Sequence, residues 1–240
     1  MNTKTIGGHL NVVALDGPRG VGKSRLGSEL RNYFGCHVLE LGPLFRLIAW
    51  FIKHGHASDF KEGCKILNNS LDVGRLRIRT DVSGKLAASR IEIDGESIEQ
   101  ELWHTELDEL VKSVAESKYV IDCIAQVAHQ LVGQPTVVIG REVGCTFFPE
   151  APLKIVLLAH HTSRRSRKRS QLSQEALTIP QTYSVERSEP SRTWEYSGDT
   201  LAIDTTNRSP EEVLQLVAER IVLELGWVVI SNCEEAHAYR

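Results

Sequence analysis

The sequence is poor in cysteine and in long apolar runs, and both shortages narrow what the protein can be. Its five cysteines are an odd number, lie far apart and include no Cys-x-x-Cys pair. This excludes a disulfide framework and a zinc ribbon, which both need paired cysteines. No apolar run approaches the roughly 20 residues of a membrane-spanning helix, and the N-terminus lacks a basic segment followed by an apolar one. We therefore expect a cytoplasmic protein without a membrane span or signal peptide.

The chain also lacks a large net charge of either sign. The chain has 28 Lys and Arg against 31 Asp and Glu, which gives a formal net charge of -3. Such a chain has no overall electrostatic attraction to nucleic acid or to an anionic membrane, so we expect neither as a partner. With 41% hydrophobic and 25% charged residues it has the composition of a globular protein, which excludes disorder and a fibrous repeat. We expect a monomer or a weak dimer.

Short apolar segments alternate with helix-like segments along the chain. Apolar, β-branched runs predict strands, and longer segments with helical periodicity predict helices. The expected strands are 10–15, 36–39, 136–139, 153–158 and 200–204, and the expected helices are 23–34, 44–53, 107–131 and 210–225. This alternation predicts an α/β fold with a five-stranded parallel sheet and helices on both faces.

Two segments interrupt the alternation. From about residue 68 to residue 100, alternating polar and apolar residues surround the dipeptides Ser83-Gly84 and Asp94-Gly95, which predicts a small β insertion. The second segment, 162–196, is rich in Arg, Ser and Gln and predicts an arm outside the core. The expected division is a core made of 1–67 and 113–240, an insertion at 68–112, and an arm at about 162–196.

The clearest motif is a phosphate loop. Residues 17–24, GPRGVGKS, match G-x-x-x-x-G-K-[ST], and they follow an expected buried strand and open an expected helix, as the motif requires. In such a loop the glycines let backbone N–H groups surround a phosphate at a helix N-terminus. The motif predicts a nucleotide site made of the loop and the arginine after it, namely Gly17, Arg19, Gly20, Val21, Gly22, Lys23, Ser24 and Arg25.

Three residues at the loop have predicted chemical roles. Lys23 would bridge the outer phosphates of the nucleotide, and the hydroxyl of Ser24 would ligate Mg²⁺. Asp16, which precedes the loop, either holds a water bound to Mg²⁺ or caps the turn. The expected cofactors are therefore ATP and Mg²⁺, and the alternative is a glycine-rich turn that binds nothing.

A phosphate loop alone does not separate kinases from GTPases and motor ATPases. The sequence has no Asn/Thr-Lys-x-Asp guanine signature, and 240 residues are few for a mechanical ATPase. A small-molecule kinase needs a second phosphate-facing site for its acceptor and a lid that excludes water, since the phosphoryl group is otherwise lost to hydrolysis. The rest of the chain therefore has to decide the class.

Over almost its whole length the sequence resembles the cytidylate kinases, a family of nucleoside monophosphate kinases with a phosphate loop. The similar segments are VALDGPRGVGKS, ELGPLFR, IEIDGESIEQEL, VVIGREVGCTFFPEAPLKIVLLA and GDTLAIDTTNRSPEEV. They resemble, in this order, the family's first strand and phosphate loop, its aspartate-serine/threonine-glycine segment, part of its acceptor-binding insertion, its Gly-Arg-Asp segment, and its last strand and helix. The resemblance implies that 68–112 binds the acceptor and that the arm is an Arg-rich lid.

The resemblance also implies roles for four arginines. Arg46 and Arg141 would grip the phosphate of the acceptor, because a planar guanidinium suits bidentate oxygen contacts. Arg187 and Arg192 resemble the lid arginines that close over the transferring group. Lys23, Arg141, Arg187 and Arg192 are thus the expected catalytic residues, together with Glu142, discussed below.

A basic run begins at the start of the arm. Five of the six residues 164–169 are Arg or Lys, and where nucleotide kinases begin their lid such residues contact ATP. We expect this contact from Arg164 or Arg167, and a nucleic-acid patch or a solvated surface are the alternatives.

The departures from the family pattern concern the acceptor. The serine and arginine that read cytosine align with Lys112 and Ile121, the serine or threonine of the acceptor segment is Leu41, and an arginine of the insertion is Trp103. Ile139 replaces an acidic residue, and Ser188 and Ser191 replace lid aspartates. A site that loses its hydrogen-bond donors loses discrimination for its ligand. We expect Leu41, Trp103 and Lys112, with Arg46 and Arg141, to line a changed acceptor site.

Glu142 stands where the family has aspartate. It is one methylene longer and would accept a hydrogen bond from an exocyclic amine, or act as a base if the acceptor is a hydroxyl. Lys112 would meet an additional anionic group. Cys123 and Cys145 are expected to be small core residues, since no histidine adjoins either one.

The sequence therefore predicts an ATP-dependent small-molecule kinase that resembles cytidylate kinase. Its expected partner is a small-molecule acceptor, either nucleotide-like or a specialised metabolite, with specificity changed from CMP. One alternative is an ordinary (d)CMP kinase whose base-reading residues are misaligned here. An alternative of another class is a nucleotide-binding regulator or pseudokinase, which Ile139 and the thinned lid favour and the intact Lys23 and Ser24 oppose.

Overall fold

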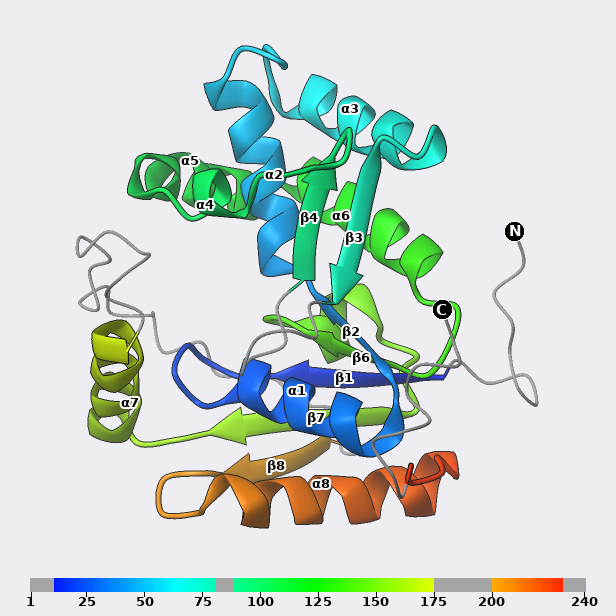
Figure 1. Ribbon diagram of the computed structural model, residues 1–240, viewed down its shortest axis with the longest axis vertical. Coiled ribbons are helices and arrows are strands. Elements are labelled where there is room, and N and C mark those ends of the chain that lie inside the picture. The colour runs from blue at the N-terminus through cyan, green and yellow to red at the C-terminus, as the bar shows by residue number, and fades with distance from the viewer. Residues whose placement is uncertain (1–10, 81–88, 175–199, 231–240) are drawn as a thin grey trace.

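The centre of the protein is a five-stranded parallel sheet (Figure 1). The computed structural model describes residues 11–80, 89–174 and 200–230. The strands are β1 (Val12–Asp16), β2 (His37–Glu40), β6 (Thr136–Ile139), β7 (Leu153–Leu158) and β8 (Thr200–Asp204), in the spatial order β2-β6-β1-β7-β8. All neighbouring strands run parallel, so their carboxyl ends meet at one edge of the sheet. Each strand predicted from the sequence is present.

The helices follow the predicted alternation, and local chemistry sets several of their ends. They are α1 (Lys23–Phe34), α2 (Gly42–Lys53), α3 (Phe60–Asp72), α4 (Glu99–Leu102), α5 (Asp108–Glu116), α6 (Lys118–Leu131), α7 (His161–Gln174) and α8 (Pro210–Leu225). A short 3₁₀ turn, η1 (Thr105–Leu107), and a π-helical turn, η2 (Val143–Phe147), complete them. Gly35 ends α1 in the left-handed conformation, and a capping box between Ser209 and Glu212 begins α8.

The residues of β1 alternate between the two faces of the sheet. Val12 and Ala14 belong to a hydrophobic cluster that includes residues of α2, α3 and α6. Val13 and Leu15 belong to a second cluster, with residues of α1 and α8. Because successive side chains of a strand point to opposite faces, a strand that is apolar throughout has to be buried on both. Helices cover both faces here, which confirms the predicted α/β fold.

The helices differ from the prediction, which includes neither α3, α4 nor α7 and joins α5 to α6. The periodicity did not indicate α3, which begins where the carboxylate of Asp59 accepts a hydrogen bond from the N–H of Glu62 at 2.8 Å. The segment predicted as one helix, 107–131, forms two helices, α5 and α6. Ser117 separates them because its backbone is extended, with φ -77° and ψ 115°.

A second, three-stranded sheet lies next to α3 and α4 (Figure 1). Its antiparallel strands are β3 (Leu76–Thr80), β4 (Ser89–Ile93) and β5 (Glu96–Ser97). Asp94 and Gly95 form the predicted turn between β4 and β5, with φ 53° and 88°, while Ser83-Gly84 lies outside the described residues. Residues 68 and 112 fall inside α3 and α5, and the division of the chain at these positions stays a prediction.

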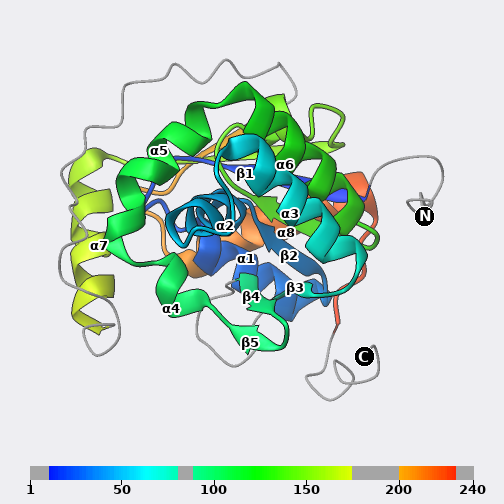
Figure 2. The ribbon, with the colours of Figure 1, turned by 90° about the horizontal axis from the view of Figure 1, so that it is seen from above.

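The described part of the arm is helical. Helix α7 covers its first residues and stands at the left-hand edge of the molecule in Figure 2. Arg187 and Arg192, like Ser188 and Ser191, lie outside the described residues. Within the ranges that the structure describes, no helix combines the length and the apolar character that crossing a membrane requires.

Candidate active site

The phosphate loop connects Asp16, the last residue of β1, to Lys23, the first residue of α1. Gly17 has φ 144°, and a Cβ there would lie 2.4 Å from the carbonyl oxygen of Leu157. Gly20 has φ 79°, and a Cβ there would lie 2.9 Å from the carbonyl oxygen of Arg164. Any side chain at these positions would be strained and would clash with backbone, so the turn requires glycine at both. The N–H groups at the start of α1 face this turn and suit a phosphate.

Lys23 lies across the loop. Its Nζ donates hydrogen bonds to the carbonyl oxygen of Gly17 at 2.5 Å and to that of Pro18 at 2.9 Å. The ammonium group is thus held against two carbonyl oxygens at the start of the loop. Its contact with the outer phosphates of a nucleotide stays a prediction.

Glu40, at the end of β2, is a site residue that the sequence reasoning missed. Its carboxylate forms a hydrogen bond with Ser24 and lies near Lys23. Burial raises the pKa of Glu40, and the bond from Ser24 and the charge of Lys23 act in the opposite direction. An acidic residue that ends a buried strand, directly before the segment LGPLFR, was the signal that could have identified it.

Whether this loop fits Mg²⁺ depends on the oxygen atoms it offers, which are the hydroxyl of Ser24 and the carboxylate of Glu40. Both are hard oxygen donors, the kind that Mg²⁺ prefers. The turn also supplies the backbone N–H groups and the lysine that a triphosphate needs. The residues present therefore fit a nucleotide and its magnesium ion.

Asp16 joins the phosphate loop to a second turn. Its Oδ1 accepts a hydrogen bond from the N–H of Val143 at 2.7 Å, and its Oδ2 accepts one from Gly144 at 2.8 Å. Asp16 is 5% exposed; burial raises its pKa, and the two backbone bonds partly oppose this. The observed role of Asp16 is to hold the start of η2, and its contact with a magnesium-bound water stays a prediction.

The turn that Asp16 holds follows β6 and carries two predicted site residues. Arg141 is exposed. Glu142 is one of two non-glycine residues with positive φ among those described, at 59°. Cys145, two residues into η2 from Val143, is exposed, so its prediction as a core residue is wrong. The turn presents this side chain to solvent because η2 buries Val143 and Gly144 instead.

Helix α7 packs against the phosphate loop through two arginines. Arg164 donates from Nη1 to the carbonyl oxygen of Arg19 at 3.3 Å. Arg167 donates to the hydroxyl and carbonyl oxygens of Thr205, at 2.9 and 2.5 Å, and Thr205 in turn bonds the carbonyl oxygen of Val21 at 3.3 Å. Both arginines lie beside the loop, as their predicted role requires, but the contacts observed are with the protein and their contact with ATP stays a prediction.

Arg25, the residue after the motif, points to the surface. It pairs with Glu29 at 2.9 Å and with Glu211 at 3.6 Å, and its side chain is 52% exposed. These contacts link α1 to the start of α8. The contact of Arg25 with the nucleotide stays a prediction.

Arg46 and Trp103, both predicted to line the acceptor site, lie together. The guanidinium of Arg46 is 4.7 Å from the centre of the Trp103 ring. It also donates to the carbonyl oxygen of Leu102 at 2.9 Å and to Oδ1 of Asp108 at 2.5 Å. Arg46 therefore ties α2 to the end of α4 and the start of α5.

Two other predicted acceptor residues, Lys112 and Leu41, and the changed position Ile121 lie on separate elements. Lys112 is exposed on α5. Leu41 is 2% exposed and belongs to the larger hydrophobic cluster, where it packs beside Gly140. Ile121 on α6 packs against the same cluster. The changed positions thus lie on different elements, with Lys112 on α5, Ile121 on α6 and Leu41 used by the core.

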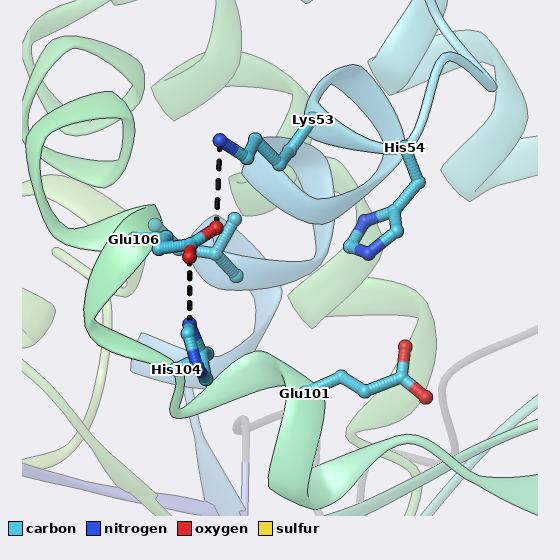
Figure 3. A pocket seen from close by; sticks show the side chains of 6 residues that line it. Lys53, His54, Glu101, His104 and Glu106 are labelled. Carbon is cyan, nitrogen blue, oxygen red and sulfur yellow. Dashed lines mark ion pairs between the residues drawn. The ribbon is translucent and has the colours of Figure 1, made fainter. Parts of the chain in front are cut away.

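A surface pocket of about 250 Å³ lies at the end of α2, and none of its lining residues belongs to the phosphate loop. Figure 3 shows Lys53 and His104 directed toward Glu106, at 3.6 and 4.0 Å. His54 and Glu101 also line this pocket. Lys53 pairs with Glu106, and the carboxylate of Glu101 accepts a hydrogen bond from Nε1 of Trp50 at 2.8 Å. A pocket that brings two carboxylates together with one lysine does not suit a phosphate.

The parallel sheet, the phosphate loop at its carboxyl edge and the Arg-bearing turns around it define a phosphate-loop phosphotransferase. The sequence model of the cytidylate kinases matches residues 13–222. The chain therefore belongs to the cytidylate kinase family, and it is an ATP-dependent nucleotide kinase.

Full-length relatives agree with this assignment. The cytidylate kinase of Acinetobacter baylyi is 27% identical over 88% of this chain and 96% of that protein. The cytidylate kinase of Caldicellulosiruptor bescii is 28% identical over 92% and 97%, and that of Geobacter sp. M21 is 30% identical over 89% and 93%. The solved structure of TT1252 from Thermus thermophilus aligns with a TM-score of 0.41 and 15% identity, over 90% of this chain and 98% of that chain, which is too distant to bear on function.

Proposed function

We propose that the protein transfers the γ-phosphoryl group of ATP to a small nucleotide-like acceptor for which its specificity has changed from CMP. The observation that carries the proposal is the aliphatic and cationic chemistry at the base-reading positions. Ile121 packs against the hydrophobic cluster, and Lys112 is an exposed cation. Cytosine needs two matched donors there.

On the donor side, the residues of the chain do the positioning. The N–H groups of the loop and the Nζ of Lys23 would hold the β- and γ-phosphates, and Ser24 with Glu40 would hold the metal. Mg²⁺, when bound, supplies charge that neutralises the phosphates and the leaving oxygen. The packing of Arg164 on Arg19 supports a site that α7 covers on one side.

On the acceptor side, we assign Arg141 as the grip for the acceptor's phosphate. It is exposed on the turn that follows β6, and β6 lies next to β1, which leads into the phosphate loop. A positioned acceptor converts phosphoryl transfer into an effectively unimolecular step, which is the main source of rate in this chemistry. Glu142, the neighbouring residue, would accept a hydrogen bond from the acceptor or take its proton.

The energetic consequence for CMP follows from its polar base. Each polar group of the ligand that is buried without its partner costs about 1 to 3 kcal/mol. Two or three such losses lower discrimination by roughly 10² to 10⁵. Contacts to the phosphate remain, so we expect a raised KM and a low kcat/KM for CMP, dCMP and UMP alike.

The test is a panel of nucleotide acceptors assayed for ADP release, with enzyme and ATP alone as the background. A kcat/KM for CMP of about 10⁴ M⁻¹s⁻¹ or more would contradict the changed specificity and make the protein an ordinary (d)CMP kinase. Replacing Lys112→Ser together with Ile121→Arg should improve CMP use, with Lys112→Ser alone as the control. ATP binding without turnover on any acceptor would favour a regulator.

A further inference from the structure

Asp16 and Gly17 are consecutive residues that serve two different turns. Gly17 opens the phosphate loop, where it has φ 144°. The carboxylate of Asp16 holds the N–H groups of Val143 and Gly144, 127 and 128 positions away in the sequence. These two residues begin η2 directly after Gly140–Glu142. One peptide bond therefore separates the donor loop from the group that fixes the acceptor turn.

The two hydrogen bonds fix the orientation of the turn as well as its distance. The first N–H groups of a helical turn have no partner within it, and a carboxylate satisfies two of them with charge-assisted bonds. Because each oxygen of Asp16 takes a different N–H, the turn cannot rotate about a single contact. Asp16 is 5% exposed, so water does not compete for these bonds.

The conformation of Glu142 makes this support necessary. Its φ of 59° lies in the left-handed region, which side-chain-bearing residues adopt only when their surroundings enforce it. The N–H of Thr146 donates to the carbonyl oxygen of Glu142 at 2.8 Å, and the N–H of Gly140 donates to that of Leu15 at 3.2 Å. Together with Asp16, these bonds hold the turn on both sides of Arg141 and Glu142.

We propose that Asp16 is a positioning residue of phosphoryl transfer, which sets Arg141 and Glu142 relative to the phosphate loop. The proposal rests on the acceptor role given to Arg141 under the proposed function. A misplacement of about 1 Å can cost on the order of 10²-fold in such reactions. Removing the carboxylate of Asp16 should therefore lower the rate of transfer to the acceptor and leave the affinity for the nucleotide unchanged.

The positioning role and the magnesium role predicted for Asp16 differ in the property that the loss of its charge would change. If Asp16 holds a metal-bound water, removing its charge weakens ADP binding in the presence of Mg²⁺ only. If it positions the acceptor turn, ADP affinity stays the same with and without Mg²⁺, and the kinetics of the acceptor change. Calorimetry with ADP, with and without Mg²⁺, separates the two roles without any turnover.

The main variant is Asp16→Asn, which keeps one acceptor oxygen and sets an NH₂ group against the second N–H. We expect ADP affinity within about threefold of the parent in both conditions and a kcat/KM for CMP lowered about 10²-fold. Combined with Arg141→Met, the same change should cost clearly less than it does alone, because one of the two residues it acts through is gone. Additive losses, an unchanged kcat/KM, or an ADP affinity lost only with Mg²⁺ would each overturn the proposal.

Two further measurements keep the proposal testable if Asp16→Asn folds poorly or CMP is not turned over. Asp16→Glu keeps the charge and both oxygens but moves them by one methylene, so the same loss on the acceptor side is expected, and parental kinetics would contradict it. Cys145 is exposed within the turn, and iodoacetamide should modify it several-fold faster in either variant. An unchanged rate refutes the role of Asp16, whereas a parent that phosphorylates no acceptor refutes the proposed function instead.

Discussion

Arg46 and Asp108 are 62 positions apart in the sequence and form an ion pair of 2.5 Å inside the acceptor region. The side chain of Arg46 is 7% exposed and that of Asp108 is 30% exposed. The ring of Trp103 covers the guanidinium. The arginine predicted to grip an acceptor phosphate is thus also a tie between α2 and α5, and these two uses predict different results for its removal.

Replacing Arg46→Met should lower the free energy of unfolding by about 2 to 4 kcal/mol, because it leaves the carboxylate of Asp108 without its partner in a partly buried site. Denaturant unfolding measures this change, and Asp108→Asn should give a smaller loss, since the asparagine still accepts a hydrogen bond. If the stability is unchanged while the KM of the acceptor rises, Arg46 is a phosphate grip alone.

Replacing Lys23→Ala should lower kcat about 10² to 10³-fold without unfolding the protein, because it removes one preorganised charge from the outer phosphates. Steady-state ADP release measures the loss of kcat, and thermal unfolding shows whether the protein stays folded. Lys61→Ala on α3, an exposed lysine outside the loop, is the matched control and should keep parental activity. Activity of Lys23→Ala within a few fold of the parent would exclude the phosphate-loop assignment.

Replacing Arg141→Met should weaken acceptor binding and lower turnover while ATP affinity stays nearly constant, because its turn adjoins the loop but is not part of it. Calorimetry with ATP and with CMP measures both affinities. Arg220→Met, which removes a surface ion pair to Glu224 on α8, is the control for losing one positive charge. If ATP binding is lost instead, Arg141 belongs to the donor site.

The thiols should respond to pH according to their burial. Burial raises the pKa of Cys36 to about 12, so at pH 8 only about one Cys36 thiol in ten thousand is ionised. Partial burial of its thiol also raises the pKa of Cys145, although the residue is exposed overall. At pH values below this raised pKa, its alkylation rate should increase about tenfold per pH unit. Peptide mass spectrometry after iodoacetamide treatment measures both rates. Equal rates at Cys36 and Cys145 in the folded protein would be inconsistent with this structure.

The sequence determined the sheet and the donor loop because both depend on local chemistry. The run Val12–Leu15 is apolar throughout, and a strand of that kind is stable only when both faces are covered. The spacing of glycines and lysine in 17–24 specifies a turn that only glycine can adopt at Gly17 and Gly20. The break at Ser117 was missed, because a single extended residue does not disturb the helical periodicity on either side of it.

The acceptor side was decided by tertiary structure, because it is built from contacts between distant segments. Nothing local to Arg46 indicates that Asp108 will lie against it, and nothing local to Asp16 indicates that it will bind the N–H groups of Val143 and Gly144. Parallel strands bring the ends of β1, β2 and β6 to one edge, and that placement also brings Glu40 to Ser24. The local sequence specified the phosphate loop with Lys23 and Ser24, while only the packing of the strands and helices decided which carboxylate holds which turn.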